Sequence, residues 1–171
     1  MSLVVSFIII ALLVLADQLI KFLVSVYLKP VTTVAVIKGV LNFTYVENTG
    51  AVFGSFSTYT ALLTVVSVIL LAVTVFFLAT KKSKSKIVNS CLILMVSGGI
   101  GNIIDRIRLH YVVDFIEPVF VNFAVFNFAD CLITVGAFTL IIYLFVEMYK
   151  DSSLQKKVKS KFGEGKKNEK S

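Results

Sequence analysis

Residues 98–130 read GGIGNIIDRIRLHYVVDFIEPVFVNFAVFNFAD, and the rest of the chain is organised around them. In a chain that is 57% hydrophobic, this stretch holds both arginines, the only histidine and four of the ten carboxylates. Three of these carboxylates, on Asp105, Asp114 and Asp130, stand among apolar neighbours. Because a carboxylate beside hydrocarbon is costly, it usually has a functional role. The rest of the chain is therefore interpreted as a scaffold that carries this stretch to one face of a membrane.

Four apolar segments predict a polytopic membrane protein, and the mean hydropathy of the chain is +0.92. Each segment approaches the roughly 20 residues that a helix needs to cross a bilayer, and the middle two show no polar face. The predicted fold class is an all-α membrane protein with four transmembrane helices, and residues 1–149 are expected to form a single membrane-embedded domain. The predicted spans are 3–28, 61–79, 87–106 and 131–148.

The net charge of +7 comes mainly from lysines that follow two of these spans. Eight lysines lie between residues 150 and 170, and four lie between residues 81 and 86. Clusters of lysine in short loops and tails mark the cytoplasmic side of a membrane protein. Both termini are therefore predicted to be cytoplasmic, and no nucleic acid is expected as a partner. Residues 150–171 are expected to be a disordered basic tail that contacts anionic lipid.

Two segments are predicted to lie on the opposite, extracytoplasmic side. Residues 31–56 are rich in valine, threonine and aromatic residues, which favour a small β-sheet on the membrane surface, with a turn at Gly39. Residues 107–130 include an apolar piece that is too short to cross a bilayer. That piece is interpreted as a short interfacial segment or a lid.

Polar side chains from three predicted helices fall at one depth. A rise of 1.5 Å per residue from the cytoplasmic end places Asp17 about 21 Å up its helix, Asn102 about 22 Å up and Asp105 about 27 Å up. Asp130 begins the last span on the same side, and the apolar neighbours of Asp114 favour its return towards the membrane. Polar residues scattered for solubility would not gather in this way, so the cluster predicts a site.

Structural roles also explain several of these residues. Asp17 and Lys21 are spaced i,i+4 and can pair, and Lys21 can also extend to the surface. The pair is either a structural ion pair that stabilises helix contacts or a polar patch on the wall of an outward-facing site. Asn127 and Asp130 are spaced i,i+3, and a carboxylate is favoured at a helix N-terminus. These alternatives stay open on the residues alone.

Metal and nucleophile chemistry fit the residues poorly, and no cofactor is expected. One histidine without a cysteine cluster cannot build a usual zinc centre, although carboxylates alone could hold Mg²⁺ in principle. A pair of Ser97 and His110 would place the serine about two turns below the outer end of its helix. Cys91 and Cys131 are predicted at different depths, beyond the roughly 7 Å between Cα atoms that a disulfide allows.

Two aspartates in apolar surroundings suit acid–base chemistry better. Like charges held close together cannot both ionise, so such a pair shares one proton. The ionised partner can deprotonate a water molecule while the protonated partner polarises a peptide carbonyl. Because the pair titrates as a unit, the sequence assigns neither role to a single residue and does not choose which two aspartates are involved.

In this respect the chain resembles the bacterial lipoprotein signal peptidases (signal peptidase II), a family of intramembrane aspartyl proteases. The likeness covers most of residues 10–147 and rests on the order and spacing of several motifs. It implies a metal-independent endopeptidase that removes the signal peptide from diacylglyceryl-modified prolipoproteins, just before the lipidated lipobox cysteine. The motifs are DQLIK at 17–21, ENTGAVFG at 47–54, GGIGNIIDR at 98–106, VVDF at 112–115 and FNFAD at 126–130.

The resemblance also implies roles for particular residues. It implies that Asp114 and Asp130 are a catalytic dyad near the outer leaflet of the cytoplasmic membrane of a monomeric, multi-pass protein. Residues 31–56 would be the external β-cradle of the family, and residues 115–128 would be part of the outer rim. Asp105 also matches the family pattern but is interpreted as structural, with Arg106 as its expected partner. Supporting roles around the substrate and the dyad are implied for Asp17, Lys21, Asn48, Gly101, Asn102, Arg106 and Asn127.

Two other functions were weighed on the same residues. A small transporter or proton-conducting protein would also carry carboxylates inside the membrane, but the sequence has no obvious internal repeat and its carboxylates gather on one side. A non-catalytic scaffold would explain Asp17, Asp105 and Asp130 as helix caps and ion pairs. It would not explain Asp114 in VVDF.

Overall fold

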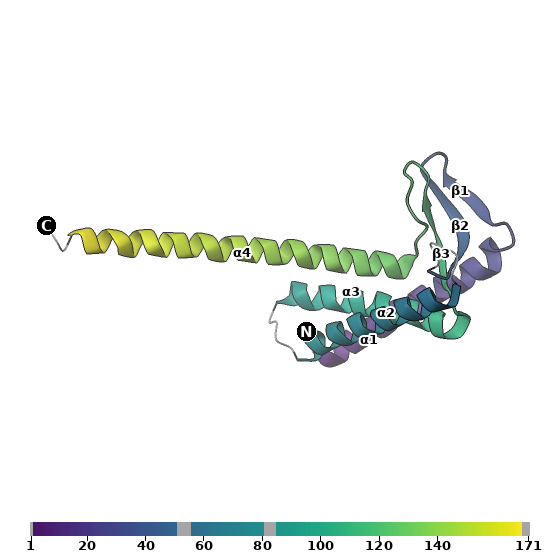
Figure 1. The fold of residues 1–171 in the computed structure, drawn as a ribbon, viewed down its shortest axis with the longest axis horizontal. Helices are drawn as coiled ribbons and strands as arrows, with labels where there is room; N and C mark the ends of the chain where they lie inside the picture. The colour runs from purple at the N-terminus through teal and green to yellow at the C-terminus, as the bar shows by residue number, and fades with distance from the viewer. Residues whose placement is uncertain (1, 51–55, 81–84, 169–171) are drawn as a thin grey trace.

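A computed structural model of the protein describes residues 2–50, 56–80 and 85–168. Within these ranges, side chains are described except at residues 56–64 and 152–168. These residues form a helical bundle with a small sheet at one end (Figure 1). The elements are α1 (Leu3–Leu23), the π-helical turn η1 (Val24–Leu28), β1 (Thr33–Ile37), β2 (Leu41–Asn48), α2 (Phe56–Ala79), α3 (Lys86–Leu109), β3 (Val112–Pro118) and α4 (Phe128–Asn168).

The helices confirm the predicted fold class. Among the residues that the structure describes, three segments are long and apolar enough to cross a membrane, namely Leu3–Leu28, Lys86–Leu109 and Phe128–Asp151. The fourth helix, α2, has 24 residues, of which Val65–Ala79 form its described apolar part. Many large apolar side chains on α1 and α4, such as Phe7 and Phe138, are exposed on the outside of the bundle. Such a surface suits contact with lipid rather than with water.

Helix α3 is central, because α1, α2 and α4 all pack against it. Glycines allow α4 to pack closely against α3. A Cβ atom on Gly98 would collide with the backbone oxygen of Ala129, and one on Gly136 would lie 2.8 Å from the backbone oxygen of Cys91. Small residues commonly permit such close packing between membrane helices. The result is that the first turn of α4 lies directly against the outer half of α3.

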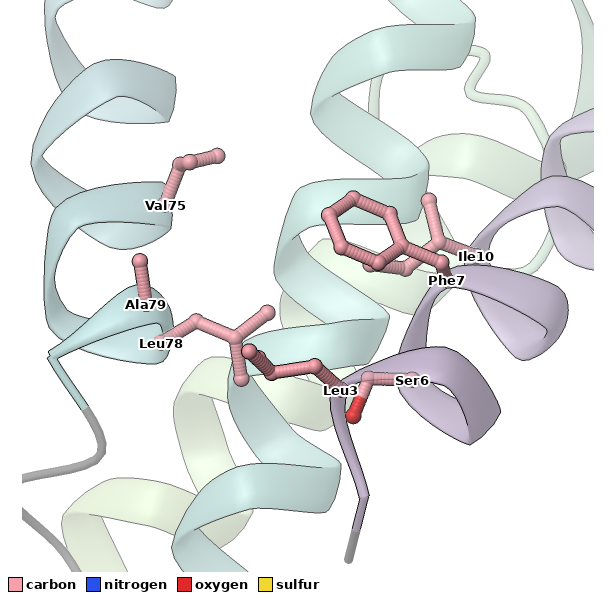
Figure 2. Close-up of a pocket in the computed structure, with 7 residues that line it drawn as sticks. All are labelled: Leu3, Ser6, Phe7, Ile10, Val75, Leu78 and Ala79. Atoms are coloured by element: carbon pink, nitrogen blue, oxygen red, sulfur yellow. The ribbon is translucent and has the colours of Figure 1, made fainter.

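A small apolar recess of about 60 Å³ separates the first turns of α1 from the last turns of α2 (Figure 2). Its lining is hydrocarbon except for Ser6, whose hydroxyl donates a hydrogen bond to the backbone oxygen of Ser2 at 3.1 Å. It lies at the opposite end of α1 from Asp17 and holds no group for acid–base chemistry. The functional site therefore lies elsewhere.

The sheet has the order β1–β2–β3 with antiparallel neighbours. Two of these strands fall within the predicted β-rich segment 31–56, of which residues 51–55 lie outside the described part. The third strand, β3, was not predicted, and it contains the VVDF motif. The polar backbone groups of this buried, apolar segment find hydrogen-bond partners on the neighbouring strand β2. A buried loop would have left these groups without partners. The pairing sets Val46 opposite Asp114.

The segment after β3 folds back on the sheet instead of forming a separate lid. The backbone amide of Val119 donates to the oxygen of Val40 at 3.0 Å, and Phe126 forms a bridge with Ile116. These bonds hold the loop against the sheet, and the chain then continues into α4. The rim predicted for residues 115–128 is therefore partly a strand and partly a loop fixed to it.

The structure differs from the prediction at the C-terminal tail. Residues 150–171 were expected to be disordered, yet α4 continues as a helix to Asn168 (Figure 1). A helix that is already formed extends at low cost through residues such as lysine, leucine and glutamine. The transmembrane helix supplies this nucleus, which the composition of the tail alone does not reveal.

Candidate active site

Asp114 and Asp130 come together at the end of the bundle that carries the sheet. Asp114 is on β3 and only 1% exposed, while Asp130 is in the first turn of α4. Asn127 connects them. Its side-chain Nδ2 donates to Asp114 Oδ1 at 2.6 Å, and its backbone amide donates to Asp130 Oδ2 at 3.1 Å. One residue therefore holds both carboxylates in a common cluster.

Asn127 also caps α4. Its Oδ1 accepts a hydrogen bond from the backbone amide of Asp130 at 2.9 Å, and Oδ2 of Asp130 accepts one in turn from the backbone amide of Asn127. This reciprocal arrangement is a capping box. The structural interpretation of Asp130 as a helix cap is therefore confirmed, but it uses only one carboxylate oxygen. The other oxygen, Oδ1, accepts from Nδ2 of Asn102 at 2.8 Å.

Asp114 is held by amides alone. Its Oδ1 accepts from Asn127, and its Oδ2 accepts from Nδ2 of Asn48 at 2.7 Å. Burial raises the pKa of the Asp114 carboxyl to about 6, and the hydrogen bonds from the two asparagines act in the opposite direction. The nearby charge of Asp130 raises this pKa further. Asp114 is thus poised to gain or lose a proton close to neutral pH.

Asn102 on α3 links this pair to a second cluster. Its Oδ1 accepts from Lys21 Nζ at 2.9 Å and from Nδ2 of Asn127 at 3.2 Å, while its Nδ2 donates to Asp130. Both ends of the amide are therefore used, which fixes its orientation. The spacing of Asn102 from Arg106 in the sequence gave no sign of this central position.

The second cluster is a buried ion group between α1 and α3. The Nζ atom of Lys21 lies 3.1 Å from Asp17 Oδ2 and 3.1 Å from Asp105 Oδ2. The predicted pair of Asp17 and Lys21 is thus confirmed. The prediction that Lys21 extends to the surface is wrong, because its side chain is only 1% exposed. Two carboxylates and the oxygen of Asn102 surround its ammonium and replace water around it.

Asp105 pairs with Lys21 and not with Arg106, so the predicted partner was wrong. The reason is direction, since Asp105 points from α3 towards α1 while Arg106, one residue on, lines the opposite side near α4. Asp105 Oδ2 also accepts from the backbone amide of Val113 at 3.2 Å. This bond attaches α3 to β3 immediately before Asp114. Asp105 therefore has a structural role, as expected, because it connects α3 to both α1 and β3.

Gln18 belongs to this second cluster and was not identified from the sequence. Its Nε2 lies within hydrogen-bond distance of Asp17 Oδ2 at 3.2 Å, Asp105 Oδ1 at 3.1 Å and the backbone oxygen of Gly101 at 3.2 Å. Its place inside the DQLIK motif was the only available signal. Gly101 is needed because a Cβ atom there would collide with the carboxylate of Asp17.

A hollow of about 290 Å³ reaches the dyad region from between α2, α3 and α4. Asn102, Arg106 and Asp130 line its polar end, and Arg106 is within electrostatic reach of both Asp130 and Asp114. The remaining lining comes from Ser67, Leu70, Thr74, Met95, Gly99 and Ile133. The hollow thus leads from an apolar region between helices to a carboxylate with a guanidinium nearby.

The other candidates from the sequence do not join this site. His110 ends α3 in a left-handed conformation, whereas the hydroxyl of Ser97 donates to the backbone oxygen of Ile93 at 2.8 Å. Cys91 and Cys131 are free thiols. Over the described residues, no three His, Cys, Asp or Glu side chains are grouped so that they could hold a metal ion. Asp114 and Asp130 are thus the predicted site residues that share a hydrogen-bond partner, Asn127.

A sequence model of signal peptidase (SPase) II matches residues 9–146 of the chain. The chain belongs to the signal peptidase II family. It is similar to the lipoprotein signal peptidase of Lactobacillus johnsonii, with 39% identity over 140 residues that cover 82% of this chain and 91% of that protein. It is also similar to the lipoprotein signal peptidase of Streptococcus pyogenes serotype M5, with 39% identity over 136 residues that cover 80% and 90% of the two chains.

Solved structures agree with this assignment to the signal peptidase II family. Two structures of a bacterial membrane enzyme each superpose with a TM-score of 0.75 and 30% identity. One alignment covers 85% of this chain and 90% of the other, and the second covers 83% and 93%. The protein is therefore a membrane-embedded protease, and its helices and its family indicate the bacterial cytoplasmic membrane.

Proposed function

We propose that the protein is an aspartic endopeptidase in which Asp114 and Asp130 form the catalytic dyad. The observation that carries this proposal is the hydrogen bonding of Asn127 to both carboxylates, one from a strand and one from a helix start. Neither carboxylate of this pair is ion-paired in the described residues, whereas Asp17 and Asp105 both contact Lys21. Of these four aspartates, Asp114 and Asp130 are therefore the two proposed to exchange a proton.

The proposed reaction uses one proton shared by the dyad. The ionised carboxylate takes a proton from a water molecule, whose oxygen attacks the carbonyl carbon of the scissile peptide bond. The protonated carboxyl gives its proton to the carbonyl oxygen. The tetrahedral intermediate then collapses as the carbon–nitrogen bond breaks, and the leaving nitrogen takes up the proton that came from water. The hydroxyl formed on the former carbonyl oxygen returns its proton to the other carboxylate as the carbonyl reforms. The dyad ends with one shared proton, as it began, and no metal takes part.

The surrounding residues are proposed to hold the dyad in this geometry. Asn48 and Asn127 orient Asp114, and Asn102 orients Asp130. Preorganised donors of this kind avoid the cost of reorienting solvent during the reaction. Arg106 adds positive charge on the side of the hollow. The proposed contribution of Asp17, Lys21 and Gly101 is indirect, because Lys21 donates a hydrogen bond to Asn102 and so helps to hold it in place.

The proposed substrates are diacylglyceryl-modified prolipoproteins, cleaved just before the lipidated lipobox cysteine. The names of the relatives support the lipoprotein part of this proposal. The hollow supports it too, because an apolar signal peptide could lie against α2 and α4 with its end at Asp130. A substrate anchored by its acyl chains is confined in depth, which lowers the entropic cost of alignment. The site would face the outer leaflet, with both termini in the cytoplasm and the protein acting as a monomer.

The test is to compare cleavage of two synthetic peptides by the purified protein in the presence of EDTA. Both peptides carry the same signal sequence and lipobox, and only one carries the diacylglyceryl group on its cysteine. Cleavage of the lipidated peptide alone, on the amino side of that cysteine, is expected. Equal cleavage of both peptides would contradict the proposed substrate, and loss of cleavage in EDTA that is restored by Mg²⁺ would contradict the metal-free mechanism.

A further inference from the structure

The sheet ends in an apolar cap at the side away from Asp114. The β1–β2 turn and the loop after β3 meet there, with Leu41 opposite Pro118 and the amide of Val119 bonded to the oxygen of Val40. Six large apolar side chains on these two loops are exposed, and together they are called the sheet tip. The sheet tip consists of Ile37, Val40, Val119, Phe120, Val121 and Phe123.

Water is an unfavourable environment for this surface. The side chains of Phe120 and Phe123 are 70% and 61% exposed, and the other four side chains of the sheet tip are each at least 38% exposed. Contiguous apolar patches of this kind on soluble surfaces usually mark contact with a protein or a membrane. The sheet tip therefore requires an apolar neighbour.

The charges around the sheet tip favour lipid as that neighbour. Residues 31–46 and 118–127, all of which the structure describes, contain a single ionic side chain, that of Lys38. The nearest carboxylate is Glu117, which is turned onto the sheet, where it accepts hydrogen bonds from Thr44 and Asn42. An apolar loop with one flexible cation suits a bilayer boundary, because lysine can reach the lipid phosphates while its neighbours enter the hydrocarbon.

The position of the sheet tip agrees with this chemistry. The sheet starts at the end of α1, crosses the end of the bundle and projects past α4, so the sheet tip does not cover the bundle (Figure 1). The green loop after β3 reaches back to the level at which α4 begins (Figure 1). The flank of α4 below this level is apolar and exposed at Val135 and Phe138. The sheet tip therefore extends over the lipid that surrounds α4.

We propose that the sheet tip inserts into the bilayer leaflet beside α4 and anchors the sheet at a fixed depth. An interfacial element typically buries its apolar face about 5–10 Å into the boundary between headgroups and acyl chains. The anchor acts on β3, which carries Asp114, while Asp130 is on the membrane-spanning α4. Lipid contact at the sheet tip thus holds one aspartate at a constant height relative to the other. This inference does not depend on the substrate proposed above.

The absence of tryptophan from the sequence gives a direct test. Phe120→Trp introduces one fluorophore at the sheet tip, and the protein is reconstituted into vesicles whose lipids carry bromine on their acyl chains. The brominated lipid is expected to quench the emission, and the bilayer is expected to shield the indole from iodide, because the side chain lies among the acyl chains. Phe123→Trp repeats the measurement at a second position. Thr33→Trp, at the other end of the sheet, is the matched control and should be quenched less by bromine and more by iodide.

Unfolding midpoints in detergent establish that each variant is folded. Emission typical of water, with no quenching by brominated lipid at either Phe120→Trp or Phe123→Trp, would overturn the proposal. Quenching by lipid that does not differ between the sheet tip and Thr33→Trp would also overturn it. Emission that becomes shielded only when a signal peptide is added would identify the substrate, and not the bilayer, as the occupant.

Discussion

Two pairs of aspartates lie side by side in this protein, yet their surroundings differ in one decisive respect. Asp17 and Asp105 share the ammonium of Lys21, whereas Asp114 and Asp130 are held by the amides of Asn48, Asn102 and Asn127. An ammonium satisfies a carboxylate by compensating its charge. An amide orients a carboxylate without removing its need for a proton or a cation. The ion cluster around Lys21 therefore suits structure, and the Asp114–Asp130 pair suits proton transfer.

The largest expected effect on stability comes from removing the Lys21 ammonium from the ion cluster. Lys21→Met leaves Asp17 and Asp105 buried without their partner, which should lower the free energy of unfolding by about 3–5 kcal/mol. The measurement is the unfolding midpoint in detergent. Lys29→Met is the matched control, because the side chain of Lys29 pairs with Glu47 but is 52% exposed, and its loss should leave the unfolding midpoint nearly unchanged. Equal losses in the two variants would remove the distinction between a buried and a surface pair.

The pH dependence of stability sharpens the contrast between the ion cluster and the Asp114–Asp130 pair. Because the pKa of Asp114 is raised to about 6, its folded form holds a proton that the unfolded form releases near pH 4. The contribution of Asp114 to stability is present below pH 4 and is lost as pH rises through 6. Relative to Asp114→Asn, the native protein should thus lose roughly 3 kcal/mol of stability across this range.

Glu47→Gln provides the control of opposite sign. The hydrogen bond from Lys29 lowers the pKa of Glu47, so its contribution is lost as pH falls, and it is small because the pair is exposed to solvent. A stability difference between native protein and Asp114→Asn that stays flat or rises with pH would contradict the raised pKa of Asp114.

A smaller effect separates the two tasks of Asn127. Asn127→Ser keeps a good helix cap but removes the amide that donates to Asp114, whereas Asn127→Ala removes both. The serine variant should keep nearly native stability, and the alanine variant should lose about 1 kcal/mol. Both variants should lose most cleavage activity and shift its pH profile. Activity that follows stability, with the serine variant near normal, would reduce Asn127 to a helix cap.

The sequence predicted the spans and the gathering of polar residues because hydropathy and helical rise are local properties. It predicted the ion pair of Asp17 and Lys21 for the same reason, since a spacing of four residues fixes a common helix face. Which partner Asp105 takes depends instead on how α3 turns towards α1, and the spacing to Arg106 was misleading. The central position of Asn102 likewise depends on contacts across 81 and 28 residues of sequence.

Strand β3 and the helical tail escaped prediction for other reasons. The VVDF segment pairs with a strand 66 residues earlier, and an apolar run of this length can equally belong to a loop or a buried helix. The tail is polar and lysine-rich, so its helix depends on the span before it. The dyad itself was assigned by resemblance, and the structure adds the asparagines that distinguish it from the ion cluster.

The most direct test of the central claim is a double-mutant comparison at the dyad. Cleavage of the lipidated peptide is measured for Asp114→Asn, Asp130→Asn and the double variant, with unfolding midpoints to verify that each is folded. If the two carboxylates act as one unit, each single variant should lose on the order of 10³-fold or more in turnover, and the double variant should lose no more than either single one. Near-normal turnover in one single variant, or losses that multiply in the double variant, would contradict a shared catalytic dyad.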